Sequence, residues 1–197
     1  MLLLEEKIHK KVVIVGIPGV GKTSLVATIV KKLLDRNIAV SVNGYGTMML
    51  DEAKNIGVKD RDELRRLTVE KQKELQKTTA EKISNLTDDI IFIDTHAFIS
   101  TNAGFYPGLP NHVIQIIQPT HFIAISARPE EIYNRRMKDE TRNRDKISIE
   151  SIKKELAIQD SMLSTCSVLS GSPMKVILNN EGKIEEAANN VIKAIGV

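Results

Sequence analysis

Residues 16–23 read GIPGVGKT, and this spacing of glycine, lysine and threonine is suited to holding phosphate groups. Gly16 and Gly21 allow the backbone to bend so that its N–H groups point toward an anion. Lys22 can bridge the β- and γ-phosphates of a nucleotide, and the Thr23 hydroxyl can reach Mg²⁺. The alternative is a glycine-rich turn that holds no ligand. An apolar run before the motif and helical spacing after it favour a nucleoside-triphosphate site.

An acidic residue follows a second apolar run, IIFIDTH, at Asp94. An acid at the end of a buried strand beside a phosphate-binding loop is typical of a second Mg²⁺ anchor. The alternative for Asp94 is a simple turn or helix cap. His96 allows two interpretations as well, because it can line an acceptor site or form hydrogen bonds within its loop.

Residues 135–146 read RRMKDETRNRDK, and half of these residues are cationic. Three partners fit such a stretch: nucleic acid, solvent around an exposed helix end, or the phosphates of a small molecule. Phosphoryl transfer relies on neutralising charge on the transferred group, which fixed guanidinium groups can do. Beside a phosphate-binding loop, the sequence favours this role for Arg142 and Arg144. The exposed helix end carries more weight for Arg136 and Lys138 than for these two arginines.

Five apolar, β-branched runs alternate with stretches of helical periodicity, which predicts an α/β fold with a mostly parallel sheet and helices on both faces. Asp60 and Glu63 have the spacing of a helix start, and Ser148 can cap a helix that ends at Gly171. Two prolines and two glycines predict a loop over 104–112. The predicted strands cover residues 11–16, 38–43, 89–94, 121–126 and 174–179.

The composition is that of an ordinary globular protein, with 42% hydrophobic and 27% charged residues and a formal charge of +3. Trp is absent and aromatic residues are few, which disfavours a nucleic-acid-binding surface. Cys166 is the single cysteine, so an intrachain disulfide and a cysteine metal cage are excluded, which fits the cytoplasm. We expect Cys166 to lie in the core, and we expect no signal peptide and no membrane span. Composition does not shift along the chain, which predicts one domain over residues 1–197.

The absence of a guanine-reading N-K-x-D motif disfavours a GTPase switch, and the length with one phosphate-binding loop disfavours a motor. Six motifs occur in a particular order: GIPGVGKT, YGTMM, KDRDELRRL, IDTHAFI, GFYPGLP and DETRNRD. In these motifs the chain resembles the archaeal-type adenylate kinase family over about residues 11–195. The resemblance implies a P-loop NTPase fold with sheet order 2-3-1-4-5, an AMP-side segment at about 44–86 and a short lid at about 135–147. It also implies reversible, Mg²⁺-dependent transfer of the ATP γ-phosphate to AMP by a cytoplasmic homotrimer.

The resemblance also assigns site residues. Arg135 joins Lys22, Arg142 and Arg144 as a catalytic residue, and Thr23 and Asp94 are the expected metal-site residues. The loop 179–183 is expected near the ATP adenine, through backbone groups. The residues implied for the AMP site are Tyr45, Gly46, Thr47, Arg61, Arg65 and His96. The residues implied for ATP binding are Gly16, Ile17, Pro18, Gly19, Val20, Gly21, Lys22, Thr23 and Ser24.

Two alternatives stay open at the level of the sequence. The first is a kinase of the same chemistry for another small acceptor, such as CMP, UMP or a sugar acid. The second is an ATP-dependent nucleic-acid or assembly factor, in which the cationic stretch contacts a phosphate backbone. The inserted lid with four cysteines that bacterial adenylate kinases carry is missing, so no structural zinc is expected.

Overall fold

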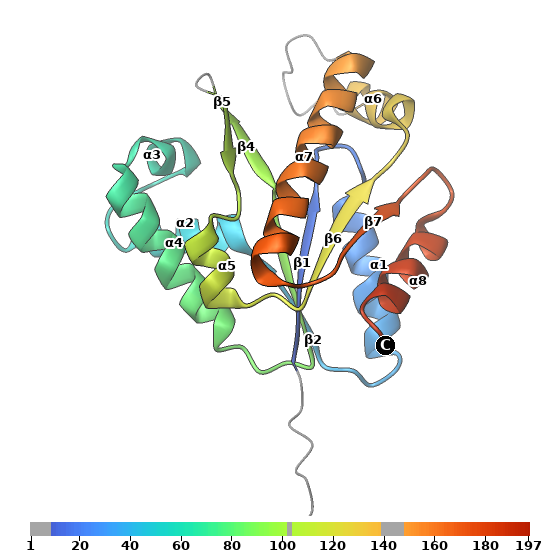
Figure 1. Ribbon diagram of the computed structural model, residues 1–197, viewed down its shortest axis with the longest axis horizontal. Helices are drawn as coiled ribbons and strands as arrows, with labels where there is room; N and C mark the ends of the chain where they lie inside the picture. The colour runs from blue at the N-terminus through green and yellow to red at the C-terminus, as the bar shows by residue number, and fades with distance from the viewer. Residues whose placement is uncertain (1–8, 102–103, 139–147) are drawn as a thin grey trace, which may run out of the picture.

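Five parallel strands form the central sheet of the computed structural model, which describes residues 9–101, 104–138 and 148–197 (Figure 1). Their order is β2-β3-β1-β6-β7, with every neighbouring pair parallel, which confirms the expected order 2-3-1-4-5. Each strand comes from one of the five apolar runs. The strands are β1 (Lys10–Gly16), β2 (Val40–Gly44), β3 (Ile90–Thr95), β6 (His121–Ser126) and β7 (Met174–Leu178).

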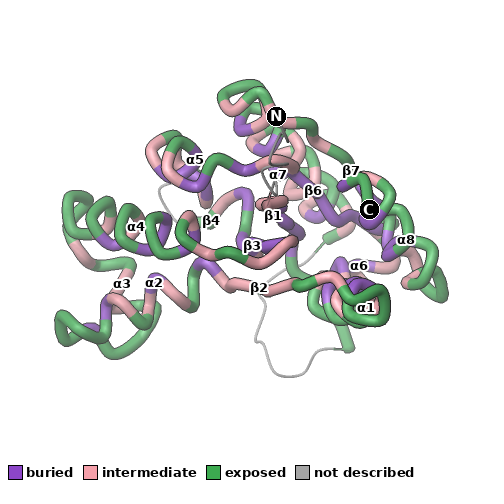
Figure 2. Tube along the Cα trace, turned by 90° about the horizontal axis from the view of Figure 1, so that it is seen from below, coloured by how far each residue is buried: buried purple, intermediate pink, exposed green. Residues whose placement is uncertain are grey.

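Successive side chains of the central strand alternate between the two faces of the sheet. Val12 and Ile14 join one buried cluster, whereas Val13 and Val15 join the other. The first cluster is covered by α1 (Lys22–Leu34) and α8 (Ile184–Ala194), which pack side by side. The second is covered by α2 (Tyr45–Lys54), α4 (Val69–Ser84) and α5 (Asn111–Ile117). Figures 1 and 2 show the resulting helix–sheet–helix layers.

The remaining helices begin and end where the sequence predicts. The Asp60 side chain accepts from the N–H groups of Asp62 and Glu63 at the start of α3 (Arg61–Arg66), and α4 follows it as the second member of a pair. Pro129 opens α6 (Pro129–Met137). Ser148 caps α7 (Ile149–Ser170), which ends at a left-handed Gly171.

The segment between β3 and β6 differs from the expectation. The prediction of a loop over 104–112 is wrong, because β4 (Phe98–Thr101) and β5 (Gly104–Pro107) pair as an antiparallel hairpin and α5 begins at Asn111. The rings of Phe98 and Phe105 meet edge to face with centroids 5.2 Å apart, which stabilises the pair. Pro107 is tolerated because it lies in a two-stranded sheet, where its missing N–H need not serve a further neighbour.

All five strands of the main sheet end at the same edge, because they are parallel. The phosphate-binding loop follows β1 there, Gly44 ends β2, and Asp94 and Thr95 end β3. Ligands of open parallel sheets bind at this edge, so the fold brings the predicted site residues toward one place. In the described part of the chain, no helix is long and apolar enough to cross a membrane.

Candidate active site

The phosphate-binding loop has the backbone conformation that its glycines allow. Gly19 and Gly21 have φ angles of 90° and 80°, a region that other L-residues seldom adopt. Helix α1 begins at Lys22, directly after Gly21, and no side chain of the described residues caps its first N–H groups. These groups and the positive end of the helix dipole are therefore free to meet an anion.

Lys22 lies between this loop and the end of β3. Its ammonium group donates to the Thr95 carbonyl at 2.6 Å and forms an ion pair with Asp94. The Lys22 side chain is only 12% exposed. Burial lowers the pKa of Lys22, while the Asp94 carboxylate opposes that shift by favouring the charged form. The predicted phosphate ligand and the predicted metal-site acid therefore contact each other directly.

A single cavity of about 780 Å³ joins this loop to helices α2, α3 and α4. Loop residues and Lys22 line one end, and α2–α4 line the other, with β3 and the β4–β5 hairpin between them. This cavity brings together most of the residues that the sequence predicts for the site. Those along its walls are Gly16, Ile17, Pro18, Lys22, Thr23, Tyr45, Gly46, Thr47, Arg61, Arg65, Asp94 and His96.

The other predicted residues do not line the cavity. Gly19, Val20 and Gly21 belong to the loop but turn elsewhere, and Ser24 is exposed in the first turn of α1. Arg142 and Arg144 lie outside the described residues. Arg135 is described, but it contacts the outer side of the loop.

The wall formed by α2–α4 combines one buried anchor with exposed cations. The Tyr45 hydroxyl donates to the Gln76 carbonyl at 2.9 Å, which ties α2 to α4. Burial raises the pKa of Tyr45, so the phenol keeps its proton. Arg61 donates to the Thr47 hydroxyl at 3.3 Å, and Arg65 pairs with Asp62 on its own helix at 3.0 Å. The guanidinium groups of this wall are therefore accessible to a ligand.

His96 links the two ends of the cavity. It lies beside the Gly16 backbone and within electrostatic range of Lys22, Asp94 and Arg61. Desolvation of the ring lowers the pKa of His96, although part of the residue is exposed, and the Lys22 charge lowers it further. The imidazole is therefore neutral near pH 7 and adds a polar group without adding charge.

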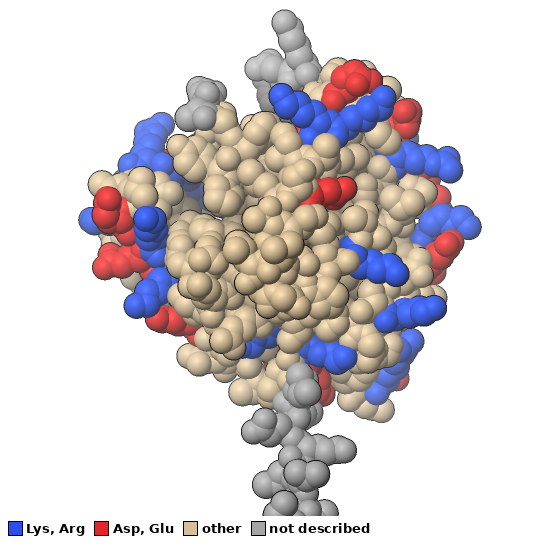
Figure 3. All heavy atoms as spheres, viewed as in Figure 1, with Lys and Arg blue, Asp and Glu red and all other residues tan. Residues whose placement is uncertain are grey.

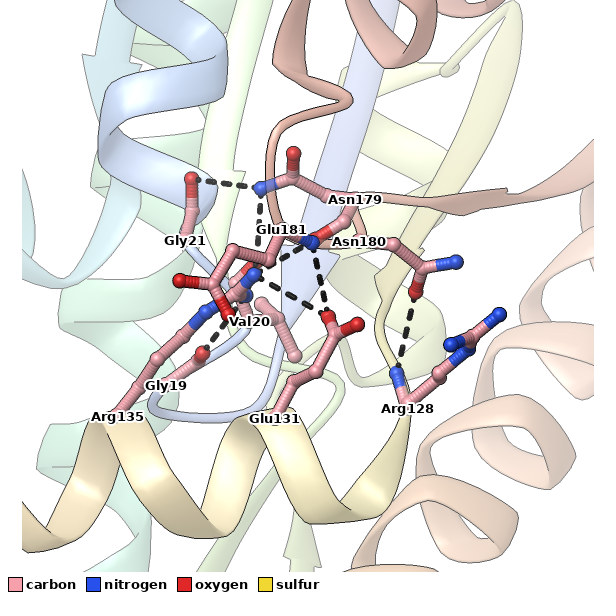
Figure 4. A network of polar contacts seen from close by, with 9 residues as sticks. All are labelled: Gly19, Val20, Gly21, Arg128, Glu131, Arg135, Asn179, Asn180 and Glu181. Atoms are coloured by element: carbon pink, nitrogen blue, oxygen red, sulfur yellow. Dashed lines mark hydrogen bonds and ion pairs between the residues drawn. The ribbon is translucent and has the colours of Figure 1, made fainter.

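Two arginines of α6 brace the phosphate-binding loop, Arg135 from its outer side and Arg136 from the wall of the cavity. Arg135 donates to the carbonyls of Gly19 and Val20, both at 3.3 Å (Figure 4). Arg136 donates from Nε to the Pro18 carbonyl at 2.7 Å and pairs through both terminal nitrogens with Glu155 of α7, at 3.3 and 2.7 Å. The alternative of an exposed helix end is wrong for Arg136, since this residue is only 6% exposed.

The sequence does not predict the side-chain contacts of several residues near the site. Glu155 lies in a helix rich in charges, and only the fold pairs it with Arg136. Asn179 is buried, and its side-chain amide donates to the Val20 carbonyl at 2.9 Å. Gln76 and Gln159 line the cavity from α4 and α7. Their identities are common on ordinary helices, so spacing alone does not single them out.

The donors around Lys22 fit a magnesium ion that arrives with a nucleotide. Thr23 and Asp94 both line the cavity and offer a hydroxyl and a carboxylate, the oxygen ligands that Mg²⁺ prefers. The described residues contain no group of three or more His, Cys, Asp or Glu side chains that could hold a metal ion. Mg²⁺ usually keeps several waters and takes phosphate oxygens as further ligands, so a hydroxyl and a carboxylate are sufficient protein donors.

Comparison with known proteins agrees with this geometry. A family model described as an AAA domain matches residues 15–153. A shikimate kinase from Acinetobacter baumannii, solved with shikimate, superimposes with a TM-score of 0.57 over 96% of this chain and 94% of that one. It is only 10% identical and shows the fold alone. Fold and loop together define a protein of the P-loop class.

Archaeal relatives identify the protein family within this class. An adenylate kinase from Thermoplasma acidophilum is 40% identical over 94% of this chain and 98% of its own length. Those of Methanocaldococcus jannaschii and Sulfurisphaera tokodaii are 36% and 39% identical, with 95% and 93% of this chain covered and 98% and 97% of theirs. The chain belongs to the archaeal adenylate kinase family.

Proposed function

We propose that the chain is an adenylate kinase, which transfers the γ-phosphate of ATP to AMP and forms two ADP reversibly. The observation that carries this proposal is the single cavity that connects the phosphate-binding loop with the α2–α4 wall. In-line transfer requires the donor and acceptor phosphates to meet end to end, and one continuous cavity allows that. Membership of the archaeal adenylate kinase family supports the same activity.

The donor end supplies backbone N–H groups and one ammonium group. A phosphate oxygen of AMP attacks the γ-phosphorus, while the bond from that phosphorus to the β–γ bridging oxygen breaks and ADP leaves. Negative charge shifts toward the bridging oxygen during this step, and Lys22 is placed to neutralise it. When bound through Thr23 and Asp94, Mg²⁺ would add further neutralisation of the phosphate oxygens.

The acceptor end supplies cations and a hydrogen-bonding wall. Arg61 and Arg65 are the candidates for the AMP phosphate, and Tyr45, Gly46 and Thr47 form the surface against which the nucleoside would lie. His96 lies between both ends and is placed to contact the transferred group. We also propose the AMP-side role for the segment at about 44–86 and a lid at about 135–147, with Arg142 and Arg144 as its catalytic arginines.

A ligand that joins two adenosines through five phosphates tests the proposal. Such a ligand carries both halves already joined, so it avoids much of the entropic cost of gathering two molecules. Calorimetry should show that it binds far more tightly than ATP or AMP alone. A parallel assay of ADP formation with AMP, CMP, UMP and a sugar acid should give the highest kcat/KM with AMP. A preference for another acceptor, or a linked ligand no tighter than ATP, would overturn the proposal.

The proposed assembly is a cytoplasmic homotrimer, and one surface supports self-association. Residues 95–127 contain no Asp, Glu, Lys or Arg, and Val168 and Leu169 of α7 are 83% and 56% exposed. Figure 3 shows a broad uncharged area on the face that carries α7. Light scattering should give the mass of a trimer for the wild type and a smaller mass for Val168→Glu. Val69→Glu, at an exposed valine of α4, is the matched control and should leave the mass unchanged.

A further inference from the structure

Asn179 is the first residue after β7, and its position is fixed from both sides. Its backbone N–H donates to the Ser126 carbonyl at 2.8 Å, which extends the pairing of β7 with β6 by one residue. Only 4% of the residue is exposed. Its side-chain amide donates to the Val20 carbonyl at 2.9 Å and to the Gly21 carbonyl at 3.4 Å (Figure 4). The sheet therefore holds an amide donor against the outer side of the phosphate-binding loop.

The Val20 carbonyl and the Gly21 N–H belong to one peptide group, and the Gly21 carbonyl and the Lys22 N–H belong to the next. A trans peptide is planar, so its C=O and N–H point in opposite directions. A donor that holds the carbonyl outward thereby directs the N–H toward the inner side of the loop. Inward-pointing N–H groups are what a phosphate-binding loop offers to its anion.

Gly21 fits closely against this amide. A Cβ atom added at Gly21 would lie 2.7 Å from Nδ2 of Asn179, and the φ of 80° also disfavours any side chain there. The Gly21 carbonyl accepts from the Leu25 N–H as well, at 3.1 Å, so the first turn of α1 shares the same anchor. The amide is thus packed against the loop at the point where the helix begins.

Arg135 provides a second brace on the same side. In addition to the carbonyls of Gly19 and Val20, its guanidinium donates to the Asn179 carbonyl at 3.1 Å and to Glu131 at 3.4 Å. Glu131 also accepts from the Glu181 N–H at 3.0 Å. Three segments are joined in this way: the loop after β1, the helix after β6 and the loop after β7 (Figure 4).

We propose that Asn179 is a positioning residue for ATP, which acts through the phosphate-binding backbone and does not touch the nucleotide with its side chain. It holds the peptide groups of Val20 and Gly21 in the orientation that the phosphates need. This inference rests on the proposed function only in naming ATP as the ligand. Loss of the two hydrogen bonds would leave these peptide groups free to rotate, and ATP would have to order them on binding.

Asn179→Leu and Asn179→Ala test this role with calorimetry. The probes are ATP and inorganic tripolyphosphate, each with Mg²⁺. Leu keeps most of the side-chain volume but has no donor, so both variants should bind both probes roughly tenfold more weakly, the effect of one or two lost hydrogen bonds. The ratio of ATP to GTP affinity and the KM for AMP should not change. Asn179→Ser, which retains a hydroxyl donor, should fall between the wild type and Asn179→Ala.

Asn189, an exposed asparagine of α8, gives the matched control, and Asn189→Ala should bind both probes as the wild type does. The proposal is overturned if Asn179→Leu binds tripolyphosphate as tightly as the wild type, which would indicate a packing role. It is also overturned if the loss is confined to the discrimination between ATP and GTP, which would indicate a contact with the base. Tripolyphosphate binding needs no acceptor, so this test remains decisive even if the wild type fails to phosphorylate AMP.

Discussion

The two ends of the cavity hold their cations in opposite ways. At the donor end, Arg136 is 6% exposed and has partners on the phosphate-binding loop and on α7. At the acceptor end, the side chain of Arg65 is 58% exposed and, within the described part of the chain, pairs only with Asp62 of its own helix. Arg61 likewise makes one long hydrogen bond, to Thr47. Arginine therefore has a structural role at the donor end, whereas at the acceptor end it is free to bind an incoming phosphate.

This difference follows from what each end must bind. The donor end relies on backbone N–H groups, which are useful only when the peptide groups keep their orientation. The buried Arg136, the half-buried Arg135 and Asn179 hold them in place. The acceptor end relies on guanidinium groups at the tips of long side chains, which can turn toward an arriving phosphate. The pre-organised end lowers the cost of binding, and the open end leaves room for the acceptor to enter.

Loss of Lys22 should have the largest effect of any single change. Lys22→Ala should lower kcat by roughly 10²–10³-fold, because it removes the charge that neutralises the transferring phosphate. The KM for ATP should change much less, since the backbone N–H groups remain. Steady-state kinetics measures both quantities, and Lys31→Ala, at an exposed lysine of the same helix, is the control. Turnover close to that of the wild type would mean that the loop does not serve phosphoryl transfer.

Arg136→Ala tests whether the donor end is held by its buried pair. Removal of one partner should lower the free energy of unfolding by about 3 kcal/mol. This value is at the lower end of the range for breaking a buried ion pair, because Glu155 keeps contact with water. Arg65→Ala, which breaks an exposed pair, should cost less than about 1 kcal/mol. Urea denaturation measures both. Equal costs at the two positions would remove the contrast between the two ends.

Arg61→Ala tests the acceptor end directly. The KM for AMP should rise roughly tenfold, the effect of one charge-assisted hydrogen bond, while the KM for ATP stays constant. Arg66, on the same helix but away from the cavity, supplies the control, and Arg66→Ala should leave both constants unchanged. A rise in the KM for ATP instead would place Arg61 with the donor.

The smallest predicted effect is on the pH dependence of stability and comes from His96, which lies between the two ends of the cavity. Its pKa is lowered in the folded protein from 6.5, so the unfolded chain binds more protons as the pH falls below that value. Acid therefore favours the unfolded state, and stability that is present above pH 6.5 is lost as the pH falls toward the folded pKa. His96→Gln should reduce the slope of Tm against pH over this range. Parallel slopes for variant and wild type would contradict the assignment.

Local patterns in the sequence predict much of the fold. The five apolar runs become the five strands of the main sheet, and the strand ends bring Lys22, Asp94 and Tyr45 to one cavity as expected. Cys166 is buried, as its apolar surroundings predict. These features depend on hydrophobic periodicity, which short segments of the sequence reveal. They also depend on the rule that the carboxyl ends of parallel strands lie at one edge of the sheet.

Two short elements escape prediction because tertiary contacts decide them. The β4–β5 hairpin contains glycine and proline, which normally indicate a loop, yet the packing of Phe98 against Phe105 supports a paired ribbon. Helix α5 spans only 7 residues, and Gln118, which follows it, has a φ of 52° where glycine is usual. Local propensity is weak in such segments, and the surroundings determine their conformation.

The braces of the phosphate-binding loop also escape prediction, for a different reason. Asn179 is 159 residues away from Val20 in the chain, and Arg136 is 118 residues away from Pro18. No spacing rule connects positions so far apart. A charged stretch such as 135–146 is usually solvated, so the burial of Arg136 follows only from where α6 packs.

The strand order has a consequence for the time at which the protein becomes competent during synthesis. The central strand carries the phosphate-binding loop and leaves the ribosome early, but its neighbours in the sheet place Val12 beside Phe92 and His121. Contacts so distant in sequence form slowly, because a long stretch of chain must be ordered first. Asn179 emerges later still. A nascent chain can therefore contain the whole nucleotide-binding motif before the residues that hold it in place have been synthesised. We expect ATP to bind only when translation is almost finished.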